Sequence, residues 1–221
     1  MGKASKRPIR ILFIGNSFTA RNDLPALIAQ LAAARGVQIE HTLLSIGGAS
    51  LRTHWNKGEA RTAIERGKFD YVVLQEQSTL PIKNAARMRE NVLLFDEVIR
   101  SAGAKTVLYM TWARKHQPEK QRVIADAYES VGREVGALVI PVGTVWWRFI
   151  SEHQSPALHD KDQSHPTLAG SYLAACTFLA TLLDESPLGI ESEVKLAESD
   201  VGKIQGAVAG PAPIRAKGVR K

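Results

Sequence analysis

The feature that most constrains the fold is a set of short apolar runs separated by segments of helical periodicity. Each run ends in small or polar residues, which is typical of a buried strand. Parallel strands joined through helices form a sheet that is covered on both faces. The sequence therefore predicts an α/β fold, a three-layer α/β/α sandwich around a five-stranded parallel sheet. The predicted strands lie within 10–14, 37–44, 71–74, 106–110 and 137–142.

Between these runs, apolar residues recur at intervals of three and four, as on one face of a helix. The predicted helices span 24–35, 85–102, 119–136, 143–150, 167–183 and 199–208, and segment 51–67 is expected to be irregular or helical. A chain of 221 residues is long enough for one core and does not require a second. We expect a single domain over 10–209, a basic N-terminal extension over 1–9 and a basic, mobile tail over 210–221.

The net charge of +7 is concentrated at the two ends of the chain. Four basic and no acidic residues fall within 1–10, and the same holds for 211–221, so the body is close to neutral. No basic stripe interleaved with aromatic residues is present in the body, and we predict no nucleic-acid partner. No apolar run approaches the ~20 residues of a membrane span. With no evident signal peptide and Cys176 as the single cysteine, we predict a cytoplasmic protein without a membrane partner.

The first predicted strand ends in Gly15-Asn16-Ser17, just before a helical pattern begins. Ligands of α/β proteins bind at the carboxyl ends of the strands, where a serine hydroxyl is well placed to be a nucleophile. Small polar residues also occur in turns for conformational reasons, so this turn is not sufficient evidence by itself. The sequence has no Gly-x-Gly-x-x-Gly after a strand and no Walker A motif, which argues against a nucleotide-binding fold.

A serine nucleophile needs a base and a group that orients the base. The loop before Pro166 offers both, because Asp162 and His165 lie three residues apart and can face the same way. Pro166 also keeps His165 out of helical geometry. Alternatively, Asp162 or Ser164 only caps the following helix and His165 is a surface residue. The order Ser17, Asp162, His165, at the carboxyl ends of the first and last strands, favours the catalytic interpretation.

An acyl-transfer site also needs hydrogen-bond donors for the oxyanion. Gly48 follows the second predicted strand and lacks a Cβ, so its backbone can approach a substrate closely. Gln75 and Gln77 follow the third strand and would point to one face if that strand continued. Both side chains carry an amide that can donate.

These features, in this order, resemble the pattern of the SGNH (GDSL-type) hydrolases over 11–183. The serine turn at 15–17, Gly48 and the Asp-x-x-His at 162–165 match three motifs of that family. The fourth departs, because Gln-Glu-Gln-Ser stands where the family has Gly-x-Asn-Asp, as in some carbohydrate-ester branches. Counting positions from the strand favours Gln77 as the oxyanion donor. Side-chain length and the similarity to Gln-Gly-Glu-Ser variants favour Gln75, which we slightly prefer.

The resemblance implies a flavodoxin-like SGNH fold and a two-step ester hydrolysis that needs no cofactor. Ser17 attacks the acyl carbon, His165 transfers the proton, and Asp162 supports the imidazolium. The backbone N–H groups of Ser17 and Gly48, with one Gln amide, stabilise the oxyanion.

We therefore predict a serine esterase for short acyl groups, mainly acetyl, with a small-molecule or carbohydrate ester as substrate. Asn16, Trp112 and Trp146 are expected to contact the substrate, although Trp112, Trp146 and Trp147 include at least one that packs in the core. The alternatives are a non-catalytic carbohydrate-binding or interaction module, and an SGNH thioesterase or lysophospholipase.

A metal hydrolase is a further alternative, because His153, His159, Asp160, Asp162 and His165 cluster in the sequence. No His-Glu-x-x-His or similar ligand spacing is present, and we predict no metal. Glu76 is expected to pair with an arginine or to face water. The histidines without an evident partner, expected to be structural or solvated, are His41, His54 and His116.

Overall fold

The sheet is parallel throughout and has the strand order β2-β1-β3-β4-β5. The structure is a computed structural model and describes residues 7–191 and 193–210. Its strands are β1 (Ile9–Gly15), β2 (Ile39–Ser45), β3 (Tyr71–Leu74), β4 (Lys105–Tyr109) and β5 (Leu138–Ile140). The five-stranded parallel sheet predicted from the alternating pattern is confirmed.

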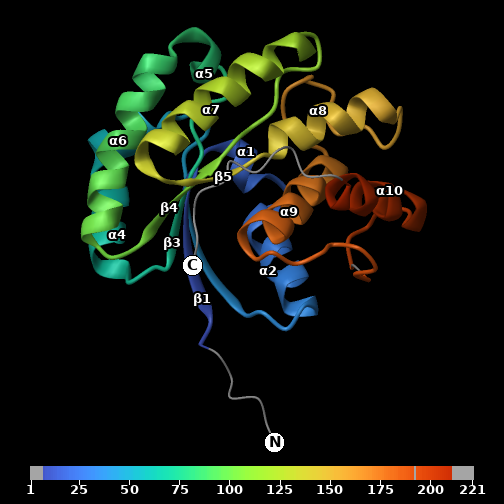
Figure 1. Cartoon of the computed structure of the whole chain (residues 1–221), viewed down its shortest axis with the longest axis horizontal. Helices are drawn as coiled ribbons and strands as arrows, with labels where there is room; N and C mark the ends of the chain where they lie inside the picture. Colours follow the sequence, from blue (N-terminus) through green and yellow to red (C-terminus); the bar gives the residue numbers. More distant parts are fainter. Residues whose placement is uncertain (1–6, 192, 211–221) are drawn as a thin grey trace, which may run out of the picture.

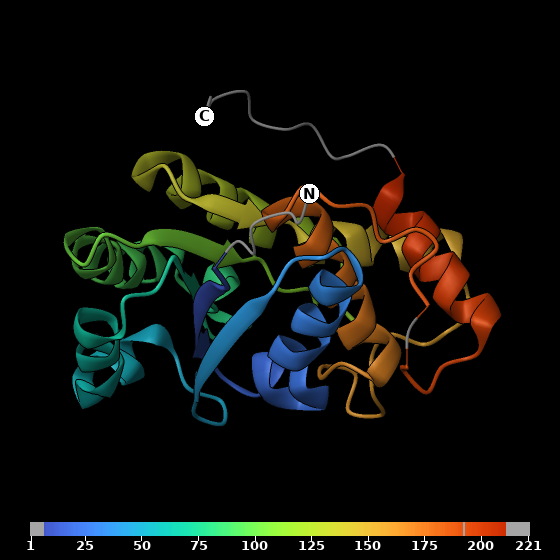
Figure 2. The same ribbon diagram turned by 90° about the horizontal axis from the view of Figure 1, so that it is seen from below.

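Helices cover both faces of this sheet, as Figures 1 and 2 show from two directions. One layer contains α2 (Leu24–Ala34), α8 (Val142–Glu152), α9 (Leu168–Leu182) and α10 (Glu198–Ala209). The other contains α3 (Leu51–Lys57), α4 (Glu59–Gly67), α6 (Ala85–Ser101) and α7 (Gln121–Val135). Short helical turns follow three of the strands: α1 (Ser17–Ala20), η1 (Arg21–Asp23), α5 (Leu80–Lys83) and η2 (Pro118–Lys120).

The central strand β1 contributes to two separate hydrophobic cores. Its alternate residues Ile11 and Phe13 pack under one helix layer, and Leu12 and Ile14 pack under the other. All four side chains are fully buried. Successive side chains of a strand point to opposite faces, so a continuous apolar run is what a strand covered on both faces requires.

Three predicted boundaries differ from the structure. Strand β2 begins two residues later than predicted, at Ile39. Segment 51–67 forms two helices, because Gly58 adopts a left-handed φ of 79° between them. Strand β5 ends at Ile140, since Pro141 has no N–H to continue the ladder and instead precedes helix α8.

At the N-terminal end, the described chain is attached to the domain earlier than the predicted boundary at residue 10. Strand β1 includes Ile9, and the Arg7 guanidinium pairs with Asp70, which also accepts the N–H of Arg10 at 2.8 Å. The remainder of the predicted extension, 1–6, and 211–221 of the predicted tail lie outside the described residues. Within the part that is described, no helix has the length and apolar character needed to span a membrane.

Candidate active site

The register of β1 brings three loops to one edge of the sheet. Gly15 is paired with Ser45 of β2, and Ile14 is paired with Leu74 of β3. The ladder continues into the loops, because the N–H of Ile46 donates to the carbonyl of Gly15 at 3.2 Å. The turn that carries Ser17 therefore lies between the loop after β2 and the loop after β3.

Ser17 is the first residue of α1, and Asn16 caps that helix. The Asn16 Oδ1 accepts the N–H of Phe18 at 3.0 Å, and its Nδ2 donates to the carbonyl of Ala49 at 2.9 Å. Asn16 is buried. The expectation that Asn16 contacts substrate is therefore not met, because both ends of its amide tie the serine turn to the loop after β2.

The loop before α9 brings His165 and Asp162 to Ser17. The Ser17 Oγ lies 2.8 Å from the His165 Nε2, and the His165 Nδ1 is hydrogen bonded to the Asp162 Oδ2. The other carboxylate oxygen of Asp162 accepts the N–H groups of Ser164 and His165 at 3.0 and 2.9 Å. The three predicted side chains thus form one hydrogen-bonded line. The cap of α9 is Thr167, and not Asp162 or Ser164 as in the alternative interpretation.

The charge distribution fixes the tautomer of the imidazole. The hydrogen bond to His165 lowers the pKa of Asp162 below its ordinary range, so Asp162 is a carboxylate and only accepts. The His165 Nδ1 must then carry the proton that it shares with Asp162. Its Nε2 presents a lone pair to the Ser17 hydroxyl, which is the arrangement of a general base and a nucleophile.

An aromatic stack supports this arrangement from below. The Phe18 ring lies 5.3 Å from that of His165 and 4.9 Å from that of Trp112, and Trp112 stacks on Trp146 at 3.9 Å. The Trp112 Nε1 donates to the carbonyl of Ser164 and so holds the Asp-x-x-His loop. Trp112 and Trp146 are only 2% and 1% exposed. The prediction that they contact substrate is wrong, because both are packed in the core.

The two glutamines after β3 have different positions. The Gln75 Oε1 accepts from the Asn16 N–H and the Thr19 hydroxyl, each at 2.9 Å, and its Nε2 donates to the carbonyl of Glu76. A Cβ at Gly15 would lie 2.6 Å from the Gln75 Oε1, so this contact needs a glycine. Both ends of the Gln75 amide are therefore occupied under the serine turn, which does not fit our preference for Gln75 as a donor.

Gln77 is less buried than Gln75 and keeps its amide nitrogen available. Its Oε1 accepts from the N–H and the hydroxyl of Thr79, at 2.9 and 3.0 Å. Within residues 7–191 and 193–210, no hydrogen-bond partner is found for the Gln77 Nε2. The same is true, over those residues, of the backbone N–H groups of Ser17 and Gly48. Gly48 adopts a φ of 66°, a conformation that favours glycine.

Sequence reasoning missed two buried polar side chains that contact these loops. The His54 Nε2 donates to the carbonyl of Gly15 at 2.8 Å, although His54 was expected to be structural or solvated without a partner. Glu76 is 1% exposed and accepts three N–H groups, whereas we expected an arginine partner or solvent. The available signal was a polar residue at a core-facing helix position, since His54 lies three residues after the buried Leu51.

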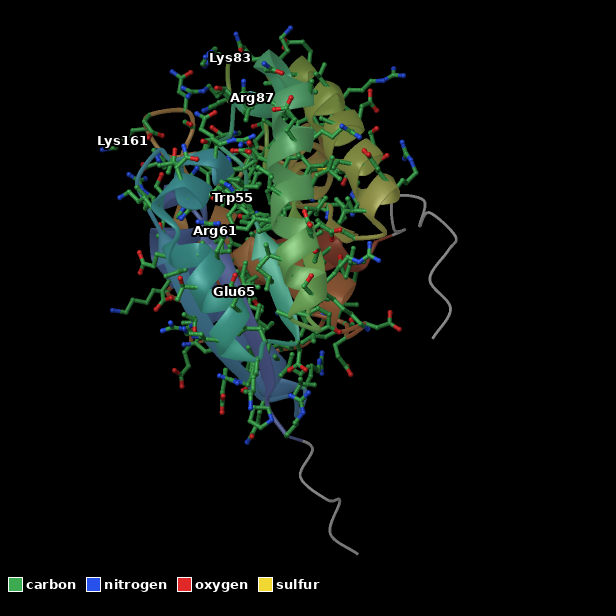
Figure 3. All side chains as sticks on the ribbon, turned by 90° about the vertical axis from the view of Figure 1, so that its left-hand side faces the viewer. Trp55, Arg61, Glu65, Lys83, Arg87 and Lys161 are labelled. Carbon is green, nitrogen blue, oxygen red and sulfur yellow. The ribbon has the colours of Figure 1, made fainter. Side chains whose placement is uncertain are left out.

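The clustered histidines and acids do not form a metal site in the described part of the chain, where no group of three His, Cys, Asp or Glu side chains is placed to hold an ion. The His159 Nε2 donates to the carbonyl of Ala113, and Asp160 pairs with Arg21. A surface hollow beside this loop is lined by Lys115, His116, His159, Asp160, Lys161 and Gln163, and thus not by the Ser17 or His165 side chains. Figure 3 shows Lys161 at the same end of the molecule as Lys83 and Arg87.

The burial of His54 makes a prediction about acid stability. Burial lowers the pKa of His54 below its ordinary value of 6.5, so the folded protein binds this proton less readily than the unfolded chain. The resulting stability is present above pH 6.5 and is lost as the pH falls through the lowered pKa. His54→Gln can keep a donor to Gly15 without titrating. We expect the free energy of unfolding in urea to fall more steeply from pH 7.5 to about pH 5 in the wild type than in this variant.

The matched control is His41→Gln, because His41 is exposed on β2. This variant should follow the wild type at both pH values. Parallel losses for the wild type and His54→Gln would show that His54 does not contribute to acid sensitivity.

Comparison with known proteins relates this geometry to a family. No protein-family model matches the chain, and no curated protein matches its sequence. Among solved structures, a protein from Slackia heliotrinireducens assigned to the SGNH hydrolases is 27% identical, with a TM-score of 0.70 over 80% of this chain and 100% of that one. A DUF4886 family protein from Bacteroides uniformis is 23% identical, with a TM-score of 0.73 over 91% and 93%. A lipase/acylhydrolase from Enterococcus faecalis is 19% identical, with a TM-score of 0.61 over 86% and 100%.

These similarities define the class first: the sheet and its two helix layers are those of the SGNH-type hydrolases. With the Ser17, Asp162 and His165 side chains in one hydrogen-bonded line at the carboxyl edge of that sheet, the chain belongs to the SGNH hydrolase family.

Proposed function

We propose that this protein is a serine esterase that hydrolyses short-chain acyl esters, mainly acetyl esters, through an acyl-enzyme. The observation that carries the proposal is the line of hydrogen bonds from the Ser17 Oγ through His165 to Asp162. A binding module would not require these three groups in this order. The partial exposure of Ser17 and His165 leaves the hydroxyl accessible to a substrate.

In the first step, the Ser17 Oγ attacks the acyl carbon while its proton passes to the His165 Nε2. Asp162 accepts the hydrogen bond from the protonated imidazole and holds the ring in place. The C–O bond of the ester then breaks, and His165 gives the proton to the leaving alcohol. In the second step, a water molecule takes the place of the alcohol, His165 takes its proton, and the acid is released from Ser17.

The oxyanion formed in each step would be stabilised by the N–H groups of Ser17 and Gly48 and by the Gln77 amide. Support for this donor set comes from the lack of other partners for these groups among the described residues. Donors that are already aimed at the developing charge need no reorganisation during the reaction. We prefer Gln77 to Gln75, because the nitrogen of Gln75 already donates to Glu76.

The preference for short acyl groups is supported by the packing of the aromatic side chains. Trp112 and Trp146, which would otherwise line an apolar acyl pocket, stack on each other in the core. Their burial removes one of the two reasons for a carbohydrate substrate, and the glutamine after β3 remains as the other. Acetylated sugars therefore belong in the substrate panel with simple acetyl esters.

Covalent labelling tests the proposal directly. A phosphonate p-nitrophenyl ester should release one equivalent of p-nitrophenol and leave a phosphonyl group on Ser17, identified by peptide mass spectrometry. In parallel, kcat/KM should fall from p-nitrophenyl acetate to butyrate and octanoate. Labelling of another residue, or the absence of labelling together with no turnover of any ester, would contradict the serine esterase. The highest kcat/KM for octanoate would contradict the short-chain preference.

Gln77 gives a separate prediction for the oxyanion hole. We expect Gln77→Ala to lower kcat by about 10²–10³-fold, the usual effect of losing one oxyanion donor, with a much smaller change in KM. Steady-state kinetics on p-nitrophenyl acetate measure both constants. Gln117→Ala is the control, because Gln117 is an exposed glutamine in the segment after β4. A wild-type kcat for Gln77→Ala would remove Gln77 from the donor set.

A further inference from the structure

The carboxylate of Glu76 is buried between two loops of the site and contacts only hydrogen-bond donors. Its Oε1 accepts the N–H groups of Leu51 and Gln77 at 3.0 and 2.7 Å, and its Oε2 accepts the Nδ2 of Asn91 at 2.7 Å. The reaction outlined above gives this side chain no chemical step. A buried carboxylate that the chemistry does not use needs another explanation.

The set of partners fits an ionised carboxylate. All three are N–H groups, and an ionised carboxylate only accepts, whereas a protonated carboxyl group would have to donate one bond. Burial raises the pKa of Glu76, and the hydrogen bonds from Asn91, Gln77 and Leu51 oppose that rise. The three donors therefore compensate for the desolvation of the charge.

The amide of Asn91 has only one orientation that satisfies its neighbours. Its Oδ1 accepts the Nε of Arg52 at 2.9 Å, so its Nδ2 must point to Glu76. Asn91 lies on α6 and is buried. The carboxylate is thus anchored to a long helix of the domain as well as to the two loops.

The two backbone contacts of Glu76 join the segments that bear the candidate oxyanion donors. Leu51 is the first residue of α3 and directly follows the loop that contains Gly48. Gln77 supplies the candidate amide. Helix α3 is itself fixed by Trp55, whose ring lies edge-on to Phe95 of α6 at 5.3 Å and under the Arg61 guanidinium, as Figure 3 shows. A carboxylate between Leu51 and Gln77 therefore sets the distance between the two loops.

We propose that Glu76, oriented by Asn91, is a positioning residue that holds the Gly48 loop and Gln77 at the separation needed to stabilise the oxyanion. This inference rests on the proposed function. Glu76 touches neither the substrate nor the reacting atoms, and it acts through the two segments that it joins. Removal of its charge should weaken transition-state stabilisation more than substrate binding.

Three variants test this with a reversal of donor and acceptor. Glu76→Gln leaves one acceptor oxygen for three donors, and Asn91→Asp places two carboxylates against each other. In the double variant, the new amide at position 76 can donate to the carboxylate at position 91, which still accepts from Arg52. We expect each single variant to lower kcat about tenfold to a hundredfold, because the donors are displaced and not removed, with KM within about threefold. The double variant should recover to within about threefold of wild type.

Asp96→Asn is the matched control. Asp96 is another buried carboxylate on α6, but it accepts from Thr106 in β4 and lies away from both loops. This variant should lower the thermal midpoint without lowering kcat, which separates positioning from a general loss of stability. Thermal midpoints and steady-state constants are measured for all four variants.

The outcomes separate the two proposals. If the wild type shows no turnover that depends on Ser17, the proposed function fails. If the wild type is active, a wild-type kcat for Glu76→Gln, or no recovery in the folded double variant, overturns the inference about Glu76. If Glu76→Gln does not fold, Asn91→Ala replaces it, because that change keeps both backbone contacts of Glu76. An unchanged kcat in that variant would also overturn the inference.

Discussion

Ser17→Ala is expected to lower kcat/KM for p-nitrophenyl acetate by about 10⁴–10⁶-fold, the range found when a serine nucleophile is removed. The physical reason is that no other hydroxyl lies on the His165 Nε2, which the Ser17 Oγ approaches to 2.8 Å. The fold should be retained, because the turn is held by Asn16 and Gln75 and not by the serine hydroxyl. Circular dichroism and thermal unfolding check the fold, and active-site titration excludes wild-type contamination.

The control for this prediction is Ser151→Ala. Ser151 is an exposed serine on α8 whose hydroxyl donates to the carbonyl of Arg148. Its loss should leave kcat/KM unchanged. Equal activity of the wild type and Ser17→Ala would contradict the acyl-enzyme mechanism.

Asp162→Asn is expected to lower kcat by about 10⁴-fold at neutral pH, the typical effect of leaving the imidazole in the wrong tautomer. The substitution is nearly isosteric, and the remaining amide oxygen can still accept the N–H groups of Ser164 and His165. The new amide nitrogen faces the His165 Nδ1, which must then accept. The proton moves to Nε2, and the ring no longer offers Ser17 a lone pair. The kcat is measured with p-nitrophenyl acetate, and KM should change much less.

Asp160→Asn is the control on the same loop. Asp160 pairs with Arg21 and does not contact His165 through its side chain, although its N–H donates to the carbonyl of His165. We expect kcat to stay within about threefold of wild type, as for most changes to an exposed ion pair. A large loss in Asp160→Asn and none in Asp162→Asn would assign the orienting role to the wrong carboxylate here.

The local pattern was sufficient for the secondary structure that carries the site. Asn84 was expected to begin a helix, and its side chain does accept the N–H of Arg87 at the start of α6. Boundaries were less certain where backbone chemistry and not hydrophobicity ends an element, as at Pro141. The serine turn, Asp162 and His165 were recognisable because they lie at the carboxyl ends of strands, where the fold itself collects side chains.

Side-chain orientation was not accessible in the same way. Gln75 and Gln77 are the same residue type two positions apart, and only their partners distinguish them. The Gln75 amide is satisfied by Asn16, Thr19 and Glu76, whereas Gln77 caps Thr79. The tryptophans gave a similar ambiguity, because an indole fits both a pocket and a core.

The sequence by itself determined the α/β sandwich and the serine, aspartate and histidine at one sheet edge, since periodicity and strand-end position are local properties of the chain. Tertiary structure alone decided which polar groups are occupied. Glu76, Asn91 and His54 obtain partners 15 to 39 positions away in the chain, so no local pattern reveals them. Burial makes an unpaired polar group costly, and the packing of helices and loops around β1 therefore selects the donors that remain free.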